Sequence, residues 1–254
     1  MLRRTPPAAA LSFLVAVTAM GLTACGPAGV NGPVEVLAGT TAEGATTING
    51  SVTVGDGAKV GEAATVNGGV RVGANVTAQS ARTVNGGVGI GSGTRIARDV
   101  ETVNGGIDLG KGADIGGAVR NVNGNIRING AHVSKGITTF TGDIDVGHGS
   151  HIEGGIHVQK PDFGNESANH IPRVVIGGES VVEGTLKFDR EVKLLVSDTA
   201  KIGNVEGATP QLFGGDDPNH LIETPSAQPP GDDAAAEGAT NAGEKPAAGA
   251  EPSH

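Results

Sequence analysis

The residues best suited to chemistry are histidines and carboxylates in the middle of the chain. His148, His151 and His157 lie close together, and His132 precedes them. A zinc site needs three or four convergent ligands. The local alternation of apolar and polar residues places His151 and His157 beside inward isoleucines, so both side chains point outward. We therefore expect solvated surface histidines and no metal site.

Two carboxylates, Asp143 and Asp145, are separated by one residue and so share one face of an extended strand. Such a pair can hold a cation or act as an acid and a base, but no third acidic group lies beside them, and solvation at the edge of a strand is the expected role. No Ser-His-Asp arrangement, phosphate-binding loop or Cys/His metal spacing is present. We expect no cofactor and no enzymatic activity.

Composition narrows the classes of partner. The chain has no Trp or Tyr and only 5 Phe, so it offers few aromatic surfaces on which bases or sugars stack. Its 27 acidic residues exceed its 18 basic ones. Such a balance disfavours binding to nucleic acid.

The elements that must position these residues repeat along the chain. The tripeptide Val/Ile-Asn-Gly returns at intervals of 18, 18, 18, 19 and 19 residues. Such a fixed period is typical of a repeat architecture rather than of a closed globular core. The asparagines of the repeat are Asn31, Asn49, Asn67, Asn85, Asn104 and Asn123.

A shorter period of six residues separates aliphatic residues, as in Ile48, Val54, Val60, Val66 and Val72. A second aliphatic residue often precedes these by two positions, which is the pattern of short strands. Three hexads make one coil of 18 to 19 residues. We therefore predict an all-β fold, a single-stranded parallel β-helix whose aliphatic positions face inward. The alternative is an antiparallel meander, because Asn-Gly is also a strong hairpin signal.

The repeated asparagines are predicted to form an internal ladder. An amide side chain can donate a hydrogen bond to one neighbour and accept one from another, so stacked asparagines can satisfy each other from coil to coil. Thr141, in the sequence Phe-Thr-Gly, takes the place of the next asparagine and ends the ladder.

The N-terminal residues predict export. Residues 1–24 contain Arg3 and Arg4 and then an apolar run that is too short to span a bilayer, which is typical of a signal peptide. The sequence Leu22-Thr23-Ala24-Cys25 resembles a bacterial lipobox, which implies that Cys25 is lipidated and becomes the mature N-terminus. The alternative is an ordinary signal peptide with an unmodified cysteine. Cys25 is the only cysteine, so no disulfide forms within the chain.

A lipid on Cys25 makes the membrane a partner of the chain. Residue 26 is Gly rather than Asp, which, if the host is a Gram-negative bacterium, favours the outer membrane, facing the periplasm or the cell surface. The localisation predicted is therefore that of a cell-envelope lipoprotein.

The domain boundaries follow from changes in composition. We expect a short linker over 25–29, the β-helix over 30–213 with a loop insertion at 160–172, and a disordered acidic tail rich in Pro, Ala and Gly over 214–254. Leu212 and Phe213 are predicted to fold over the last coil as an apolar cap, which prevents strands from adding to that end.

Two family resemblances bear on function. The Val-Gly hexads resemble those of hexapeptide acyltransferases, which implies a trimer with an active-site histidine and an acyl-CoA donor. That donor is not expected outside the cytoplasm. The stretch Thr53 to Gly61 and the recurring Asn-Gly-Gly-Val are more similar to bactofilins, which implies a non-enzymatic scaffold that self-associates. The prediction is thus an envelope scaffold or interaction surface, with an adhesin-like module that binds glycan or protein as the alternative.

Overall fold

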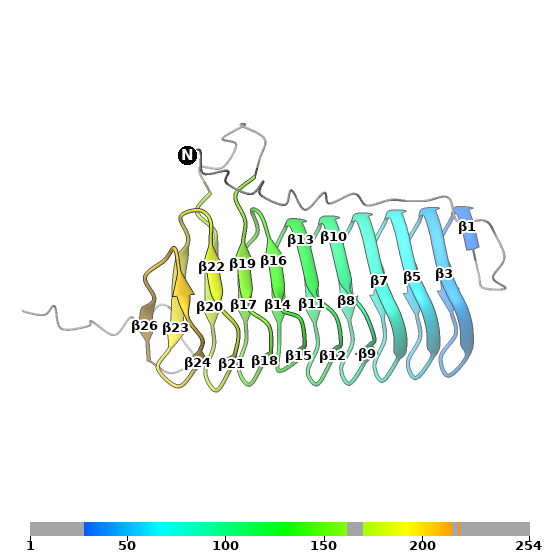
Figure 1. The fold of residues 1–254 in the computed structure, drawn as a ribbon. Helices are drawn as coiled ribbons and strands as arrows, with labels where there is room; N and C mark the ends of the chain where they lie inside the picture. The colour runs from blue at the N-terminus through cyan, green and yellow to red at the C-terminus, as the bar shows by residue number, and fades with distance from the viewer. Residues whose placement is uncertain (1–27, 162–169, 215–217, 219–254) are drawn as a thin grey trace, which may run out of the picture. The chain divides into compact units, whose positions relative to one another are not determined.

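The computed structural model describes residues 28–161, 170–214 and 218, in which every regular element is a β-strand. The predicted signal peptide, Cys25, the middle of the predicted insertion at 160–172 and nearly all of the predicted tail lie outside these residues. Residues 28–161 and 170–214 form a parallel β-helix of about ten coils (Figure 1). The predicted fold class is therefore confirmed.

One side of the β-helix is a ten-stranded sheet, which we call the front sheet. It takes one short strand from each coil, and all its neighbouring strands are parallel. Its strands are β2 (Val34–Val36), β4 (Val52–Val54), β6 (Val70–Val72), β8 (Val88–Ile90), β11 (Ile107–Leu109), β14 (Ile126–Ile128), β17 (Ile144–Val146), β20 (Arg173–Ile176), β23 (Lys193–Ser197) and β26 (Gln211–Phe213).

The other two sides of each coil belong to one sixteen-stranded sheet. Its first strands are β1 (Ala28–Asn31), β3 (Thr41–Asn49), β5 (Lys59–Asn67) and β7 (Thr77–Asn85). After β7 the sheet divides into two columns of shorter strands. One column holds β9 (Arg95–Ile96), β12 (Asp114–Ile115), β15 (His132–Val133), β18 (His151–Ile152), β21 (Val181–Val182) and β24 (Lys201–Ile202). The other holds β10 (Val100–Asn104), β13 (Val119–Asn123), β16 (Ile137–Thr139), β19 (Ile156–Val158), β22 (Leu186–Phe188) and β25 (Val205–Glu206).

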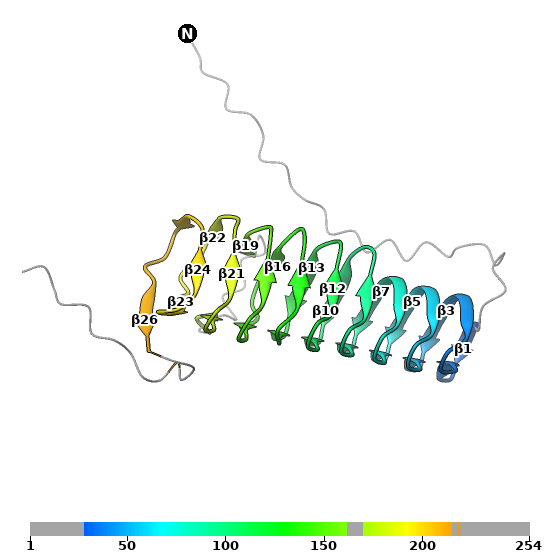
Figure 2. The ribbon, with the colours of Figure 1, turned by 90° about the horizontal axis from the view of Figure 1, so that it is seen from below.

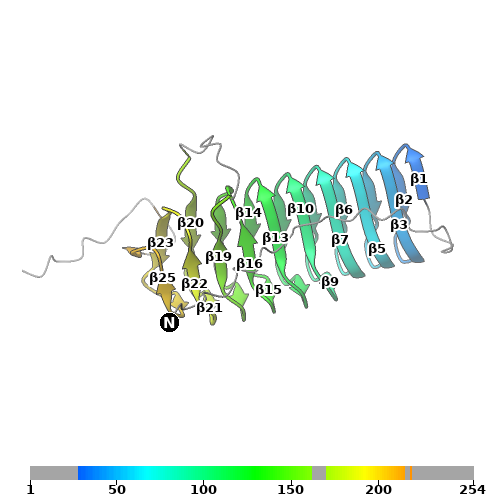
Figure 3. The same ribbon diagram turned by 45° about the horizontal axis from the view of Figure 1, so that its top comes forward.

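Equivalent residues of successive coils stack directly on one another. Val52 pairs with Val70, Val70 with Val88, and Asn67 with Asn85. Figures 2 and 3 show the coils following one another from β1 to β26, with the same strand of each coil in line. A side-chain type that repeats in the sequence therefore becomes a column in space, with neighbours about 4.8 Å apart.

The core is a continuous column of aliphatic side chains inside the coils. In the three-residue strands of the front sheet from β2 to β17, the first and third residues face inward, as Val70 and Val72 do, and the second faces out. The opposite wall is lined by Ala45, Ala63 and Ala81 in the early coils and by larger residues such as Ile137 and Leu186 later. This burial of apolar surface is the main stabilising contribution of each coil.

The change from 18 to 19 residues per repeat has a local cause. The inward residues Ala78 and Ala81 are three positions apart in β7, whereas the residues that stack on them, Ile96 and Val100, are four apart. The additional residue forms a corner between β9 and β10, so the long strand of the early coils becomes two short ones. One inserted residue thus divides the wide sheet into two columns.

The prediction that all the aliphatic columns face inward is wrong for one column. The aliphatic residue of each Val/Ile-Asn-Gly tripeptide points outward: Val66 and Val84 are half-buried, and Ile48 is 45% exposed. The residue before it is buried instead, as Thr65 and Thr83 show. Because side chains alternate along a strand, a buried threonine requires that the following valine face out.

Candidate functional site

The six repeated asparagines form a hydrogen-bonded column along one corner of the β-helix. From Asn49 onward, the amide nitrogen of each donates to the side-chain oxygen of the asparagine in the preceding coil, over 2.8 to 3.1 Å. The Thr141 hydroxyl donates to the Asn123 amide oxygen at 2.6 Å. All six asparagines are exposed, so the prediction of an internal ladder is wrong. The asparagines lie where the chain turns from one sheet to the other. The inward-facing position is held by the residue two positions earlier, such as Thr65 before Asn67, so the asparagine side chains face solvent.

A second, buried column lies beside the ladder and was not predicted. Four threonines and one asparagine donate hydrogen bonds over 2.7 to 3.1 Å to the carbonyl oxygen of the Asn-Gly glycine in the coil before. The donors are Thr47, Thr65, Thr83, Thr102 and Asn121. A carbonyl buried without such a donor costs free energy. The sequence signal was a polar residue two positions before each repeated asparagine from Asn49 to Asn123.

The later coils carry histidine–carboxylate pairs on their outer faces. All five histidines within 28–161 and 170–214 have a carboxylate oxygen within 3.1 Å. His132 contacts Asp114 of one adjacent coil at 2.8 Å and Glu153 of the other at 3.0 Å. These pairs join neighbouring coils, from the coil of Asp114 onward.

The pKa of His132 is raised above its ordinary value of 6.5. The hydrogen bond to Asp114 is the largest cause and Glu153 adds to it, while partial burial opposes both. The His132 ring also lies 5.4 Å from that of His151, measured between ring centroids. Among the residues described, no group of three or more His, Cys, Asp or Glu side chains is arranged to hold a metal ion.

Asp143 and Asp145 do not form a joint site. The Asp143 carboxylate accepts hydrogen bonds from the backbone amide of Arg173 at 2.9 Å and from the His170 ring at 2.8 Å. It thereby fastens the end of the 160–172 insertion to the coil before it. Asp145 is exposed in the outward column of the front sheet.

Arg120 is the centre of an ionic cluster on the outer face of β13. It contacts Asp99 at 2.7 Å and Glu101 at 2.8 Å. Partial burial raises the pKa of the Asp99 carboxyl, but the Ala118 amide and the Arg120 guanidinium outweigh burial, so this pKa lies below its ordinary value. The cluster holds the corner that separates β9 from β10 in successive coils.

The predicted cap does not cover the last coil as expected. Phe213 is 1% exposed, but it pairs with Ser197 and packs against Val175 and Leu195 on the outer face of the front sheet. Leu212 is in register with inward Val196 and is 37% exposed. The two side chains therefore lie on opposite faces of β26, because adjacent residues of a strand point in opposite directions.

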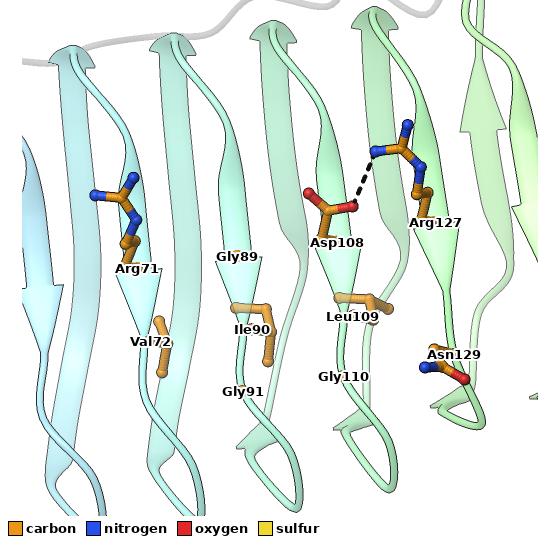
Figure 4. A pocket seen from close by; sticks show the side chains of 10 residues that line it. All are labelled: Arg71, Val72, Gly89, Ile90, Gly91, Asp108, Leu109, Gly110, Arg127 and Asn129. Carbon is orange, nitrogen blue, oxygen red and sulfur yellow. Dashed lines mark hydrogen bonds and ion pairs between the residues drawn. The ribbon is translucent and has the colours of Figure 1, made fainter.

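The front sheet also carries a hollow of about 520 Å³ on its outer face, over β6, β8, β11 and β14 (Figure 4). The outward column there reads Arg71, Gly89, Asp108 and Arg127. Asp108 and Arg127 contact each other at 3.5 Å and are both about 60% exposed. Gly89 lies between Arg71 and Asp108 and leaves a gap in the column. The hollow is a shallow depression open to solvent rather than an enclosed cleft.

No helix within 28–161 or 170–214 is long and apolar enough to cross a membrane. Cys25, the predicted lipidation site, lies outside the described residues, three positions before β1 begins. Comparison with known protein families, with curated proteins and with solved structures finds no match to this chain. Function must therefore be inferred from the residues themselves.

Proposed function

We propose that this chain is a lipid-anchored, non-enzymatic β-helix of the bacterial cell envelope that acts as a scaffold or interaction surface. The observation that carries the proposal is the unbroken stacking of coils from β1, which begins at Ala28, to β26. A lipid on Cys25 would hold the β-helix close to the membrane, because β1 begins only three positions after Cys25. The resemblance to bactofilins supports the scaffold role.

The construction of the rod supports mechanical stiffness. Each coil is joined to the next by backbone hydrogen bonds. In the early coils, up to the coil of Asn121 and Asn123, the buried threonine column and the asparagine ladder add side-chain hydrogen bonds. In such a solenoid each coil contacts only its neighbours, so stability grows with every coil interface. The outer columns are then held at fixed spacing, as a binding surface requires.

The anchor is tested by changing Cys25 to Ser and fractionating the cells. The wild-type protein is expected in the membrane fraction as a lipidated species, and the variant in the soluble fraction. An inhibitor of the lipoprotein signal peptidase should cause the wild type, but not the variant, to accumulate as precursor. Equal fractionation of both proteins, with and without inhibitor, would contradict the anchor.

An adhesin-like role that binds glycan or protein is the second candidate. The hollow over Gly89 favours it, since this hollow places a basic side chain beside bare backbone on an otherwise regular face. Pull-down of envelope material by the wild type and by a variant with Gly89 changed to Val would separate the two candidates. Loss of captured glycan or protein in that variant indicates a binding module, and unchanged capture indicates a scaffold.

A further inference from the structure

We propose that the hollow over Gly89 binds a carboxylated sugar unit of an acidic glycan. This inference rests on the proposed role of the outer surface in binding and is independent of the lipid anchor. It is carried by an unexplained glycine, by an arginine without a partner and by the shape of the hollow.

Gly89 has no structural reason to be glycine. Its neighbours on this face do: a Cβ on Gly91 would lie 2.5 Å from the carbonyl group of Gly73, and a Cβ on Gly87 would lie 3.3 Å from the Gly106 oxygen. A Cβ on Gly89 would meet no atom within 4 Å, and its φ is not in the left-handed region. Glycine inside a strand is unfavourable and marks a bulge, a tight bend, or the close approach of a ligand or another backbone. Gly89 pairs in regular register with Arg71 and Asp108, so it does not lie at a bulge.

Arg71 supplies the charge that a ligand needs. Within residues 28–161 and 170–214, Arg71 makes no salt bridge and no side-chain hydrogen bond, which is also true of Arg98 and Arg173. Arg82, Arg95, Arg120 and Arg127 are each paired with a carboxylate. Of the three arginines unpaired within these residues, Arg71 lines this hollow. A guanidinium binds a carboxylate through two parallel hydrogen bonds. Charge complementarity therefore favours an anionic ligand, although the chain as a whole is acidic.

The opposite wall of the hollow suits hydroxyl groups. Asp108 accepts hydrogen bonds, Arg127 donates them, and the Asn129 side chain lies at the lower margin of the hollow and does both (Figure 4). Arg71 and Asp108 are two coils apart, or roughly 10 Å. A sugar ring between them would place its carboxylate at Arg71 and its hydroxyls at Asp108.

The floor of the hollow favours a sugar ring over a peptide. It consists of backbone at Gly89, inside β8, and at Gly91 and Gly110, which directly follow β8 and β11. The Gly91 and Gly110 amides donate to the Val72 and Ile90 carbonyls of the preceding coils at 2.8 Å. Because these amides are already bonded, a ligand meets mainly Cα hydrogens here, and the C–H face of a pyranose can pack on them. A peptide, in contrast, binds a sheet at an edge with free amides.

The test is titration of the full chain carrying Cys25→Ser, which is unlipidated, with pentagalacturonate. Binding is followed by calorimetry and by the amide NMR signals of Gly89, Gly91 and Asp108. Neutral galactopentaose and a pentameric Asp peptide serve as competing probes. We expect saturable binding of the uronate alone, with shifts confined to the hollow.

Two variants locate the site, each with a matched control. Arg71→Gln should weaken binding roughly ten- to hundredfold, as loss of a charge-assisted contact predicts, whereas Arg98→Gln on another face should not. Gly89→Val fills the hollow and should abolish binding without lowering the denaturation midpoint, whereas Thr53→Val in the same column should change neither.

The proposal is overturned by no uronate binding, by equal binding of the neutral sugar, by tighter binding of the peptide, or by unchanged affinity of both hollow variants. None of these outcomes affects the fractionation of the Cys25 variant, so failure of the sugar site and failure of the anchor are distinguishable.

Discussion

Thr83 donates its hydroxyl proton to the carbonyl oxygen of Gly68 at 2.7 Å, across 15 residues of sequence. The threonine is 4% exposed, so water cannot easily replace it. The bond satisfies a backbone carbonyl at a corner where the next coil packs closely. Buried threonines, rather than the exposed asparagines, therefore support the Asn-Gly corners from inside.

Changing Thr83 to Val should reduce stability by about 1 to 3 kcal/mol, because the shape is kept while the Gly68 carbonyl loses its donor. Thr139→Val is the control, since Thr139 is fully buried but its hydroxyl has no hydrogen-bond partner within residues 28–161 and 170–214. That variant should be neutral or slightly stabilising. Urea denaturation midpoints measure both, and equal midpoints would remove the proposed role of the threonine column.

Asn85→Ala breaks two hydrogen bonds of the ladder, to Asn67 at 2.9 Å and from Asn104 at 3.0 Å. Because the ladder is exposed, water can satisfy the remaining amides, and we expect a cost of about 0.5 to 1.5 kcal/mol. The same denaturation experiment should therefore rank Thr83→Val above Asn85→Ala. The reverse order would indicate that the ladder, despite its exposure, is the stronger support.

Gly89→Ala and Gly91→Ala form a matched pair two residues apart in one coil. The first should be neutral or stabilise by up to about 1 kcal/mol, since the site is open and alanine restricts the unfolded chain. The second should destabilise by about 1 to 3 kcal/mol or more, because its Cβ meets the Gly73 backbone at 2.5 Å. Thermal unfolding of both variants checks the steric explanation, which similar melting temperatures would refute.

The His132 pair predicts a pH dependence. The pKa of His132 is higher in the folded chain than in the unfolded chain, where it is about 6.5. The contacts of the charged ring with Asp114 and Glu153 therefore stabilise the fold fully at pH values below 6.5. This stabilisation is lost as the pH rises through the pKa of the folded chain. Solvent screens the pair, so a few tenths to about 1 kcal/mol is expected. The stability difference between wild type and His132→Gln, from urea titrations, should be larger at pH 5.5 than at pH 8.

The groups that face His132 are Asp114, Glu153 and the His151 ring, and Arg95 contacts Asp114 at 3.0 Å. Asp114→Asn removes the largest cause of the raised pKa and should flatten the difference between the two pH values. A difference that persists unchanged in the Asp114→Asn background would assign the pH dependence to another group.

Phe213→Ala should loosen the last strand. Its ring is buried with Val175 and Leu195, and removing such a ring costs about 3 to 5 kcal/mol in a packed core. Leu212→Ala, on the more exposed side of the same strand, should cost less. Amide hydrogen exchange in β23 and β26 measures this local loss, while exchange in β5 should stay unchanged. Equal protection in the two variants would contradict the outer-face packing.

The sequence alone determined the coil, because a solenoid is built from neighbours along one axis. The spacing of the asparagines and of the aliphatic residues predicted the parallel stacking, and the single inserted residues predicted the lengthened repeats. It also showed which side-chain types would stack, since a repeated residue meets its own copy.

The tertiary structure decided which way each column faces. The Val-Asn-Gly residues follow a strand into a corner, and only the path of the backbone there shows that Thr83 points in while Val84 and Asn85 point out. The contact between His151 and Glu183 spans 32 residues and an insertion, which no short period reveals. Gly89 likewise looks like any other glycine of a glycine-rich repeat until its neighbours are in place. The physical reason is the same in each case. A periodic sequence determines which side chains stack on one another, but the exposure of a side chain and its contacts depend on how the three sides of each coil close around the core.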